Sequence, residues 1–292
     1  MAGRKDPLRI AVSIGVYAVV SWGGQIVFFL MLSMAGTLAG FTLATLSAAI
    51  FANWLALRVY EDRSLLALGL YAHRASAENL ALGILGGAGA ACLVLTPPLL
   101  IGAAHWVRLP EAPGVGTLPF LIVLLAAGSA GEEILIHGYG FQALIRMLGR
   151  WPAVLLVGVI FGAMHSANPH ESPFGLANTA GFGVLFGYAF LRSRDLWLPI
   201  GLHFGWNFTL PLFGVNLSGL KMIVTSHEIV WAVGPLWSGG EYGPEASLLT
   251  SAVLVVLLVF LWRAPLRRQT APLIDSNAEP TLCAPASSPP SP

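Results

Sequence analysis

Long apolar runs recur along the whole chain, separated by short polar stretches. A run of about 20 apolar residues is long enough to cross a bilayer as a helix. The pattern predicts an all-α polytopic membrane helix bundle with about eight transmembrane helices. These spans are expected at approximately 9–34, 37–59, 79–105, 117–145, 151–168, 174–192, 195–214 and 245–263.

The segments between and beyond the spans have a different composition. Residues 215–244 form a mixed polar and apolar stretch and are expected to be an extracytoplasmic loop, with Trp231 and Trp237 at the membrane interface. A stretch rich in Pro, Ser and Ala closes the chain and predicts a disordered tail. The expected division is 1–8 (cytoplasmic), 9–114 (N-terminal helices), 115–214 (central core), 215–244 (loop), 245–268 (last helix) and 269–292 (tail).

Small residues cluster inside several spans and predict close helix packing. The clearest examples are the stretch 86–89 and Gly183-x-x-x-Gly187. The third span also contains Pro97-Pro98, where a kink or a partly re-entrant segment is expected.

Composition narrows the class of protein. Hydrophobic residues make up 56% of the chain and charged residues only 10%, whereas soluble domains carry about 25% charged residues. A soluble enzyme is therefore a poor fit. The net charge of +1 provides no basic face for phosphates, which argues against nucleic-acid binding. Cys92 lies in a span and Cys283 in the tail, so neither a disulfide framework nor a cysteine metal site is expected.

The distribution of basic residues predicts the orientation, because cytoplasmic segments carry an excess of Lys and Arg. With the N-terminus inside, the outer segments hold only Arg108 and Lys221. An even number of spans then places both ends in the cytoplasm. The Lys-poor, Gly- and Ala-rich composition indicates a bacterial inner-membrane protein. The inner segments hold Arg4, Lys5, Arg9, Arg58, Arg63, Arg74, Arg146, Arg150, Arg192, Arg194, Arg263, Arg267 and Arg268.

Polar residues interrupt the spans at a few places. A carboxylate in the middle of a membrane costs a few kcal/mol, so the adjacent acids of the fourth span suggest a functional site. Asn178 is interpreted as a hydrogen-bonding contact between helices. The polar clusters are Glu132-Glu133-x-x-x-His137, Phe161-x-x-x-His165, Asn178 and His203-x-x-x-Asn207.

Helix geometry sorts these residues. Residues four apart share a face, so Glu133 can pair with His137. Glu132 is rotated by about 100° from its neighbour, and we expect it to face the bundle interior where His165 and His203 converge. By rise per residue, His165 lies roughly 20 Å and His203 roughly 12 Å from the inner ends of their helices. Convergence therefore requires helix tilt or shifted span boundaries.

The predicted cluster suits hydrolysis of a peptide bond. A glutamate and a histidine that hold a water molecule can act as its general base. His203 and Asn207 carry donors for a developing oxyanion. Two Glu and two His side chains could also ligate zinc, but the chain has no H-E-x-x-H motif. A mechanism without metal or other cofactor is therefore favoured.

Three motifs in order resemble the CPBP family, which comprises type II CAAX prenyl proteases and bacteriocin-processing (ABI) proteins. The family patterns are EExxxR, FxxxH and HxxxN/B. The resemblance covers roughly 115–210 and implies an eight-helix bundle with a catalytic core at 115–214. It also implies a glutamate endopeptidase that acts on a membrane-associated peptide or protein. The matching stretches are Glu132-Glu133-Ile-Leu-Ile-His137, Phe161-Gly-Ala-Met-His165 and His203-Phe-Gly-Trp-Asn207.

The resemblance assigns a role to each motif residue. It implies that Glu132 activates water together with His165, and that His203 and Asn207 stabilise the oxyanion. Glu133 corresponds to the second, less essential acid. Phe161 is expected to shape the pocket beside His165.

The chain departs from the family at one position. His137 stands where the family usually has Arg, and His is shorter and near neutral. It is expected to brace Glu133 only partially and in a pH-dependent way. This departure leaves room for a non-catalytic immunity or scaffold protein of the same family. A proton-coupled transporter also fits acids and histidines in spans, although the chain shows no pair of repeat-related broken helices.

Overall fold

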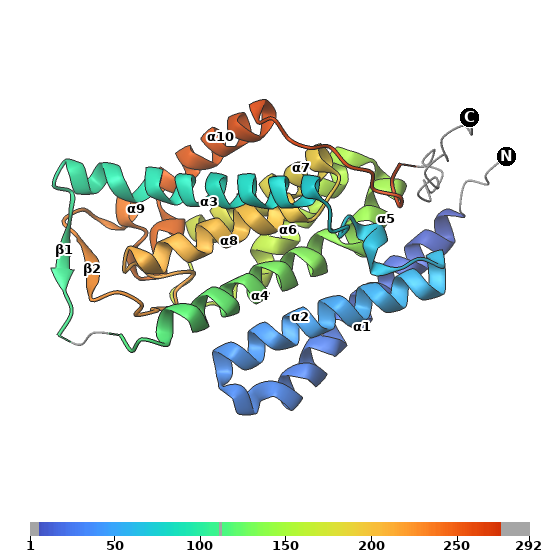
Figure 1. The fold of residues 1–292 in the computed structure, drawn as a ribbon, viewed down its shortest axis with the longest axis horizontal. Coiled ribbons are helices and arrows are strands. Elements are labelled where there is room, and N and C mark those ends of the chain that lie inside the picture. Colours follow the sequence, from blue (N-terminus) through green and yellow to red (C-terminus); the bar gives the residue numbers. More distant parts are fainter. Residues whose placement is uncertain (1–5, 111–112, 276–292) are drawn as a thin grey trace, which may run out of the picture.

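The computed structural model describes residues 6–110 and 113–275, and these are mostly helical (Figure 1). One small antiparallel sheet accompanies the helices, formed by β1 (Ala104–Arg108) and β2 (His227–Trp231). The helices are α1 (Pro7–Leu32), α2 (Thr37–Ala56), α3 (Arg74–Leu100), α4 (Thr117–His137), α5 (Tyr139–Leu148), α6 (Arg150–Met164), α7 (Pro173–Ser193), α8 (Trp197–Leu212), α9 (Pro235–Ser238) and α10 (Leu248–Arg263).

Several helices are long and apolar enough to cross a membrane. Five described stretches meet both conditions, and α6 and α10 are apolar but shorter. The structure therefore confirms a helical bundle of membrane type, while the number of eight spans and the orientation of the termini stay predictions. The five stretches are Pro7–Ala35, Thr37–Glu61, Arg74–Leu100, Thr117–Leu148 and Pro173–Ser193.

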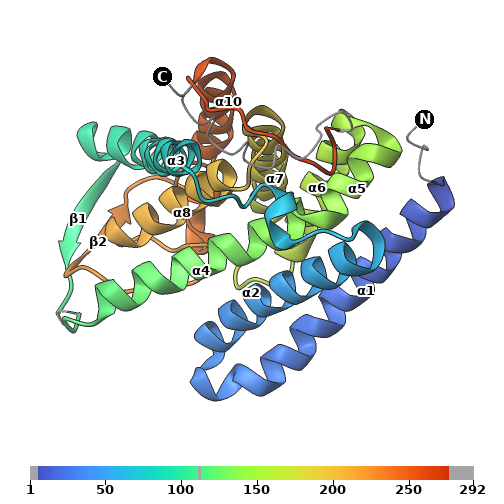
Figure 2. The same cartoon turned by 45° about the vertical axis from the view of Figure 1, so that its right-hand side comes forward.

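The helices are arranged around α4 and α8. α1 and α2 form a hairpin at one side of the molecule, and α2 packs on α4 (Figure 2). α4 in turn packs on α8, which lies along α3, while α6 and α7 pack together and α7 contacts both α8 and α10. Residues from α4, the end of α6 and α8 are thereby brought to the centre of the bundle.

The contact between α3 and α8 is made by backbone atoms. A Cβ added at Gly87 would overlap the carbonyl oxygen of Leu202, and one added at Gly205 would overlap that of Ile84. The predicted close approach is thus confirmed at Gly87. It is wrong for Gly89, where the added Cβ has no described atom within 4 Å apart from its chain neighbours and the backbone of its own helix.

The third predicted span was too long at its C-terminal end, and the predicted loop 215–244 contains regular structure. α3 ends at Leu100, and Gly102 turns the chain with φ +76°. β1 follows, and its Ala104 pairs with Trp231 of β2. The all-α class therefore gains a two-stranded ribbon, because residues 104–108 find a partner far along the chain.

The fourth predicted span is two helices that break at Gly138. The ψ angle of Gly138 is −133°, a value that is incompatible with a continuous α-helix. The side-chain amide of Asn53 donates to the carbonyl of Ile134 (3.0 Å), and the Tyr139 N–H donates to Oδ1 of Asn53 (2.7 Å). Asn53 thus supplies the hydrogen bonds that the break removes, which is what buried backbone groups require.

The disorder predicted for the tail is wrong for residues 269–275. The Gln269 N–H donates to the carbonyl of Ser193 (2.7 Å), and Ala271 and Leu273 are buried. These contacts give the segment a fixed place at the end of α7. The remainder of the predicted tail, including Cys283, lies outside the described residues.

Candidate active site

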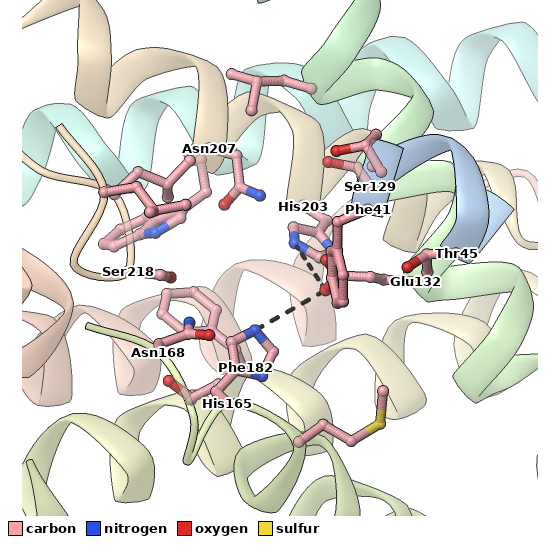
Figure 3. Close-up of a pocket in the computed structure, with 18 of the residues that line it drawn as sticks. Phe41, Thr45, Ser129, Glu132, His165, Asn168, Phe182, His203, Asn207 and Ser218 are labelled. Atoms are coloured by element: carbon pink, nitrogen blue, oxygen red, sulfur yellow. Dashed lines mark ion pairs between the residues drawn. The ribbon is translucent and has the colours of Figure 1, made fainter. Parts of the chain in front are cut away.

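The four side chains predicted to be catalytic, and Phe161, line one pocket with a cavity volume of about 170 Å³, whereas Glu133 and His137 lie behind it. Glu132 comes from the penultimate turn of α4, and His165 follows the last residue of α6. His203 and Asn207 come from α8, one turn apart. Figure 3 shows these four side chains directed into the same space. The tilt or boundary shift that convergence requires is therefore present.

Glu132 lies between two imidazole rings. Its Oε2 is 3.9 Å from Nε2 of His165 and 3.9 Å from Nε2 of His203 (Figure 3). Both distances exceed a direct hydrogen bond. Oε2 is buried and has no hydrogen-bond partner among the described residues. A water molecule fits this arrangement, because it bridges polar atoms that are too far apart for direct contact.

Two more buried oxygens in the pocket wall lack partners within the described chain. They are Oγ of Ser129 and Oγ1 of Thr45, which Figure 3 shows near Glu132. Buried polar atoms are normally satisfied by protein or ordered water, and one water needs only about 10–15 Å³ of such volume. The polar end of the pocket is therefore suited to hold water.

His165 has a defined orientation. Its Nδ1 is 2.8 Å from the carbonyl oxygen of Phe161, and a carbonyl only accepts, so Nδ1 carries a hydrogen. Nε2 then points toward Glu132 and can accept a hydrogen bond when the ring is neutral. The Phe161 ring packs against the imidazole with centroids 4.8 Å apart. Phe161 thus orients His165 with both its backbone and its ring.

Glu133 bridges two histidines. Its Oε2 is 2.7 Å from Nδ1 of His137, the contact that helix spacing predicts. Its Oε1 is 2.8 Å from Nδ1 of His203, a contact that the sequence analysis missed. Glu133 is completely buried, and the second contact fixes the ring of His203 so that Nε2 faces Glu132. Local spacing contains no signal for it, because His203 comes from another helix.

His137 reaches Glu133 although it is shorter than the Arg of the family pattern. The imidazole is completely buried and packs edge-on against the Phe141 ring at 5.1 Å. Its Nε2 has no hydrogen-bond partner among the described residues. His137 therefore provides one hydrogen bond where an Arg would provide a fork.

Glu245 is a pocket residue that the sequence analysis did not single out. It lies just before α10, is buried, and lines the pocket. Its Oε1 accepts from Nε1 of Trp206 (3.3 Å), and its Oε2 accepts from the N–H and the hydroxyl of Ser218. Burial raises the pKa of the Glu245 carboxyl, and the hydrogen bonds from Ser218 oppose this effect. An acid directly before an apolar run was its only sequence signal.

The acids and histidines of the pocket are also side-chain types that can bind a metal ion. Among the residues that the structure describes, no group of three His, Cys, Asp or Glu side chains is placed to hold one ion. The histidine nitrogens nearest to Glu132 are both directed at its carboxylate from 3.9 Å.

Comparison with known families matches the part of the chain that builds most of this pocket. Residues 114–209 match the family model described as type II CAAX prenyl endopeptidase Rce1-like. This segment contains all three motifs, from Glu132 to Asn207. A comparison with curated proteins finds no match. The family match supports the resemblance given by the motifs: residues 114–209 are similar to the Rce1-like type II CAAX prenyl endopeptidases of the CPBP family.

Proposed function

We propose that this protein is an intramembrane endopeptidase of the CPBP type that hydrolyses a peptide bond of a membrane-associated peptide or protein. One observation carries the proposal. The carboxylate oxygen Oε2 of Glu132 has no hydrogen-bond partner among the described residues and lies 3.9 Å from a nitrogen of His165 and from one of His203. This is the geometry expected of a carboxylate that holds and deprotonates a water molecule. The family match supports the same class of activity.

The first step is attack by water. A water between Glu132 and His165 donates one hydrogen bond to the carboxylate and one to Nε2 of His165. Glu132 takes a proton from the water, whose oxygen then bonds to the carbonyl carbon of the substrate. The π electrons of the carbonyl move to its oxygen, which becomes an oxyanion. No metal is needed for this step, since the carboxylate supplies the base.

The second step is collapse of the tetrahedral intermediate. The Asn207 amide donates to the oxyanion, and His203 donates from Nε2 in its imidazolium form. That form is favoured because Nδ1 of His203 already donates to Glu133 (2.8 Å), whose carboxylate balances the charge. The C–N bond breaks, Glu132 returns its proton to the leaving amine, and the carboxylate is regenerated.

The substrate is expected to reach the pocket from the membrane. Apart from the polar residues described, the pocket wall is dominated by apolar and aromatic side chains, which suit a lipid-associated peptide. CAAX-type or bacteriocin-like processing at a cell membrane, with both chain ends in the cytoplasm, is the form of the activity that we propose. The apolar wall includes Leu124, Leu125, Phe161, Phe182, Phe186 and Trp206.

Replacement of Glu132 tests the proposal. Purified protein in nanodiscs is mixed with synthetic peptides that carry, or lack, a farnesylated cysteine near the C-terminus, and the products are identified by mass spectrometry. Glu132→Gln keeps the shape of the side chain but removes the base. We expect kcat to fall by about 100-fold or more, with KM little changed. Glu171→Gln, in an exposed loop, is the matched control.

Two outcomes would contradict the proposal. One is cleavage by Glu132→Gln at the wild-type rate. The other is absence of peptide cleavage by the wild type together with an immunity phenotype that survives Glu132→Gln, which would favour the non-catalytic alternative. Proton-coupled uptake into proteoliposomes that Glu132→Gln abolishes would instead favour a transporter.

A further inference from the structure

We infer that the turn 217–220 forms the pocket wall that selects an apolar substrate side chain next to the scissile bond. The carboxylate of Glu245 holds this turn in place. This inference rests on the proposed function. The turn and Glu245 both lie outside the segment 114–209 that matches the family. They therefore describe what this chain adds to the shared motifs.

The turn has a defined backbone conformation. Ser218 and Gly219 have positive φ angles of 49° and 82°, and Leu217 and Leu220 exchange N–H···O bonds of 2.9 and 2.8 Å. A two-residue turn with positive φ at both central positions is of type I′. A Cβ at Gly219 would overlap the carbonyl oxygen of Pro169. The turn thus rests on the loop that follows His165.

Glu245 ties this turn to α8. Its carboxylate accepts from the N–H and the hydroxyl of Ser218, and also from Nε1 of Trp206. The Gly219 N–H donates to the carbonyl of Tyr242 (2.7 Å). All four backbone N–H groups of the turn therefore have partners. Trp206 directly precedes Asn207 on α8, so the same carboxylate links the turn to the helix that carries the proposed oxyanion donors.

The backbone of Glu245 is fixed as well. The side-chain amide of Asn178 donates to the backbone carbonyls of Glu245 (2.8 Å) and Ser247 (3.0 Å), and the Ser251 hydroxyl donates to Oδ1 of Asn178 (2.7 Å). Asn178 thus makes the contact between helices that the sequence predicts, and that contact anchors the acid behind the turn.

The turn presents apolar side chains to the cavity. Leu217, Leu220 and Met222 line the pocket, and Figure 3 shows Ser218 across the pocket from Glu132. A peptide whose carbonyl lies between Glu132 and His203 therefore places an adjacent side chain against this wall. The nearby acid is occupied by three donors and offers the substrate no free charge. The wall is thus suited to an apolar side chain and discriminates by size.

Trimming the wall tests this selectivity. Leu220 is 37% exposed, so Leu220→Ala enlarges the pocket without removing a buried core residue. Peptides that differ only in having Ala, Val, Leu or Phe beside the scissile bond are compared by kcat/KM. We expect Leu220→Ala to shift the Phe-to-Ala preference by about tenfold toward Phe. Leu236→Ala, at an exposed leucine of α9 that is not part of the pocket, should leave the preference unchanged.

The second experiment removes the charge of Glu245, which holds the turn. Glu245→Gln keeps the size of the side chain but replaces one acceptor by a donor. We expect KM to rise several-fold, kcat to stay nearly unchanged, and the side-chain preference to flatten. Glu241→Gln, an exposed acid of the same segment, is the control. If Glu245→Gln does not fold, Ser218→Ala removes one of the three hydrogen bonds and should give the same effect in weaker form.

The outcomes separate this inference from the proposed function. An unchanged preference in Leu220→Ala, or loss of kcat at constant KM in Glu245→Gln, would overturn the role of the turn while cleavage itself stands. Binding of the same peptides, labelled with a fluorophore, to Glu132→Gln protein reports the preference without any cleavage. If the wild type cleaves none of these peptides, this binding assay still decides whether Leu220 sets the preference.

Discussion

At the scale of single residues, two adjacent acids have opposite surroundings. The side chain of Glu132 is 27% exposed and has one oxygen without a hydrogen-bond partner in the described part of the chain, whereas the side chain of Glu133 is fully buried between two histidines. The rotation of about 100° between successive helix residues separates them. Glu132 is partly exposed and thereby available for chemistry, whereas Glu133 is buried and orients His203.

Loss of His137 should destabilise the protein through Glu133. His137→Ala removes one of the two partners of a completely buried carboxylate. Breaking a buried pair in this way costs about 3–5 kcal/mol, so we expect a clear fall of Tm in detergent. His170→Ala is the comparison, because His170 pairs with Glu241 at 3.0 Å on the exposed surface, where such a pair is worth about 0–1 kcal/mol. Equal effects of the two substitutions would contradict this account of Glu133.

Spacing within one helix predicted part of the site at this scale. The four-residue rule gave the contact between Glu133 and His137 and put His203 and Asn207 on one face of α8. It could not give the contact between Glu133 and His203, which depends on how α4 and α8 lie side by side. Glu245 was missed for the same reason, since its partners Trp206 and Ser218 are far from it in sequence.

At the scale of helices and strands, the backbones of α3 and α8 come into direct contact at glycines such as Gly87 and Gly205. Gly87→Ala would place a methyl group on the carbonyl oxygen of Leu202, whereas Gly89→Ala meets no atom within 4 Å. We expect Gly87→Ala to lower Tm strongly, because the backbone of one helix must move. Gly89→Ala should be neutral or stabilising by up to ~1 kcal/mol, since Ala favours helix. A thermal melt of both variants checks this, and equal melting temperatures would contradict the packing argument.

Apolar windows predicted the existence of the long helices better than their ends. The window that contains the acids continues past Gly138, so no local pattern indicated that Asn53 of α2 would stabilise a break there. β1 and β2 were missed because each is five residues long and lies in a loop. Their pairing is non-local, and no local pattern identifies the partner.

At the scale of the whole molecule, the segment after α10 fastens several helices together. Asn79 of α3 donates to Asp195 (2.7 Å) and to the carbonyl of Arg267 (2.8 Å). Gln269 also donates to Asp195, and the Leu198 N–H at the start of α8 donates to the same carboxylate (3.2 Å). Asp195, a buried acid between α7 and α8, thus accepts hydrogen bonds from α3, from the start of α8 and from the segment after α10.

This acid makes stability depend on pH. Burial raises the pKa of Asp195, and its hydrogen bonds oppose the effect. A carboxyl whose pKa is raised on folding contributes stability that is fully present below its ordinary pKa of about 3.9 and is lost as the pH rises through the folded value. We expect the difference in Tm between wild type and Asp195→Asn to move in favour of the wild type as the pH falls from about 7 toward about 4.

The pH series needs a reference acid, for which Glu171→Gln is suitable because Glu171 is exposed. Its difference from the wild type should show no comparable trend. A difference for Asp195→Asn that stays constant over the range, or that moves in favour of the variant on acidification, would contradict the raised pKa.

At this scale, the sequence predicted that the site residues converge only if the helices tilt or the span boundaries shift. Rise per residue placed His165 and His203 at different depths, and convergence required tilt or shifted boundaries. The structure meets this condition: α6 ends at Met164, just before His165, and α8 begins at Trp197, so both predicted boundaries move by a few residues. Tilt depends on the packing of α6, α7 and α8, and the sequence of one helix does not specify that packing.

The glycine contact between α3 and α8 has a consequence for how this protein can be recombined with relatives. The segment 114–209 carries every motif residue, yet α8 rests on a helix that precedes this segment. The wall opposite Glu132 and the acid that holds it follow the segment. A chimera that exchanges only 114–209 would therefore place the reacting groups against helices and a turn from another protein. Because Asn53 and Thr45 of α2 also support the break at Gly138 and the pocket wall, the smallest portable unit extends from the start of α2 through Glu245.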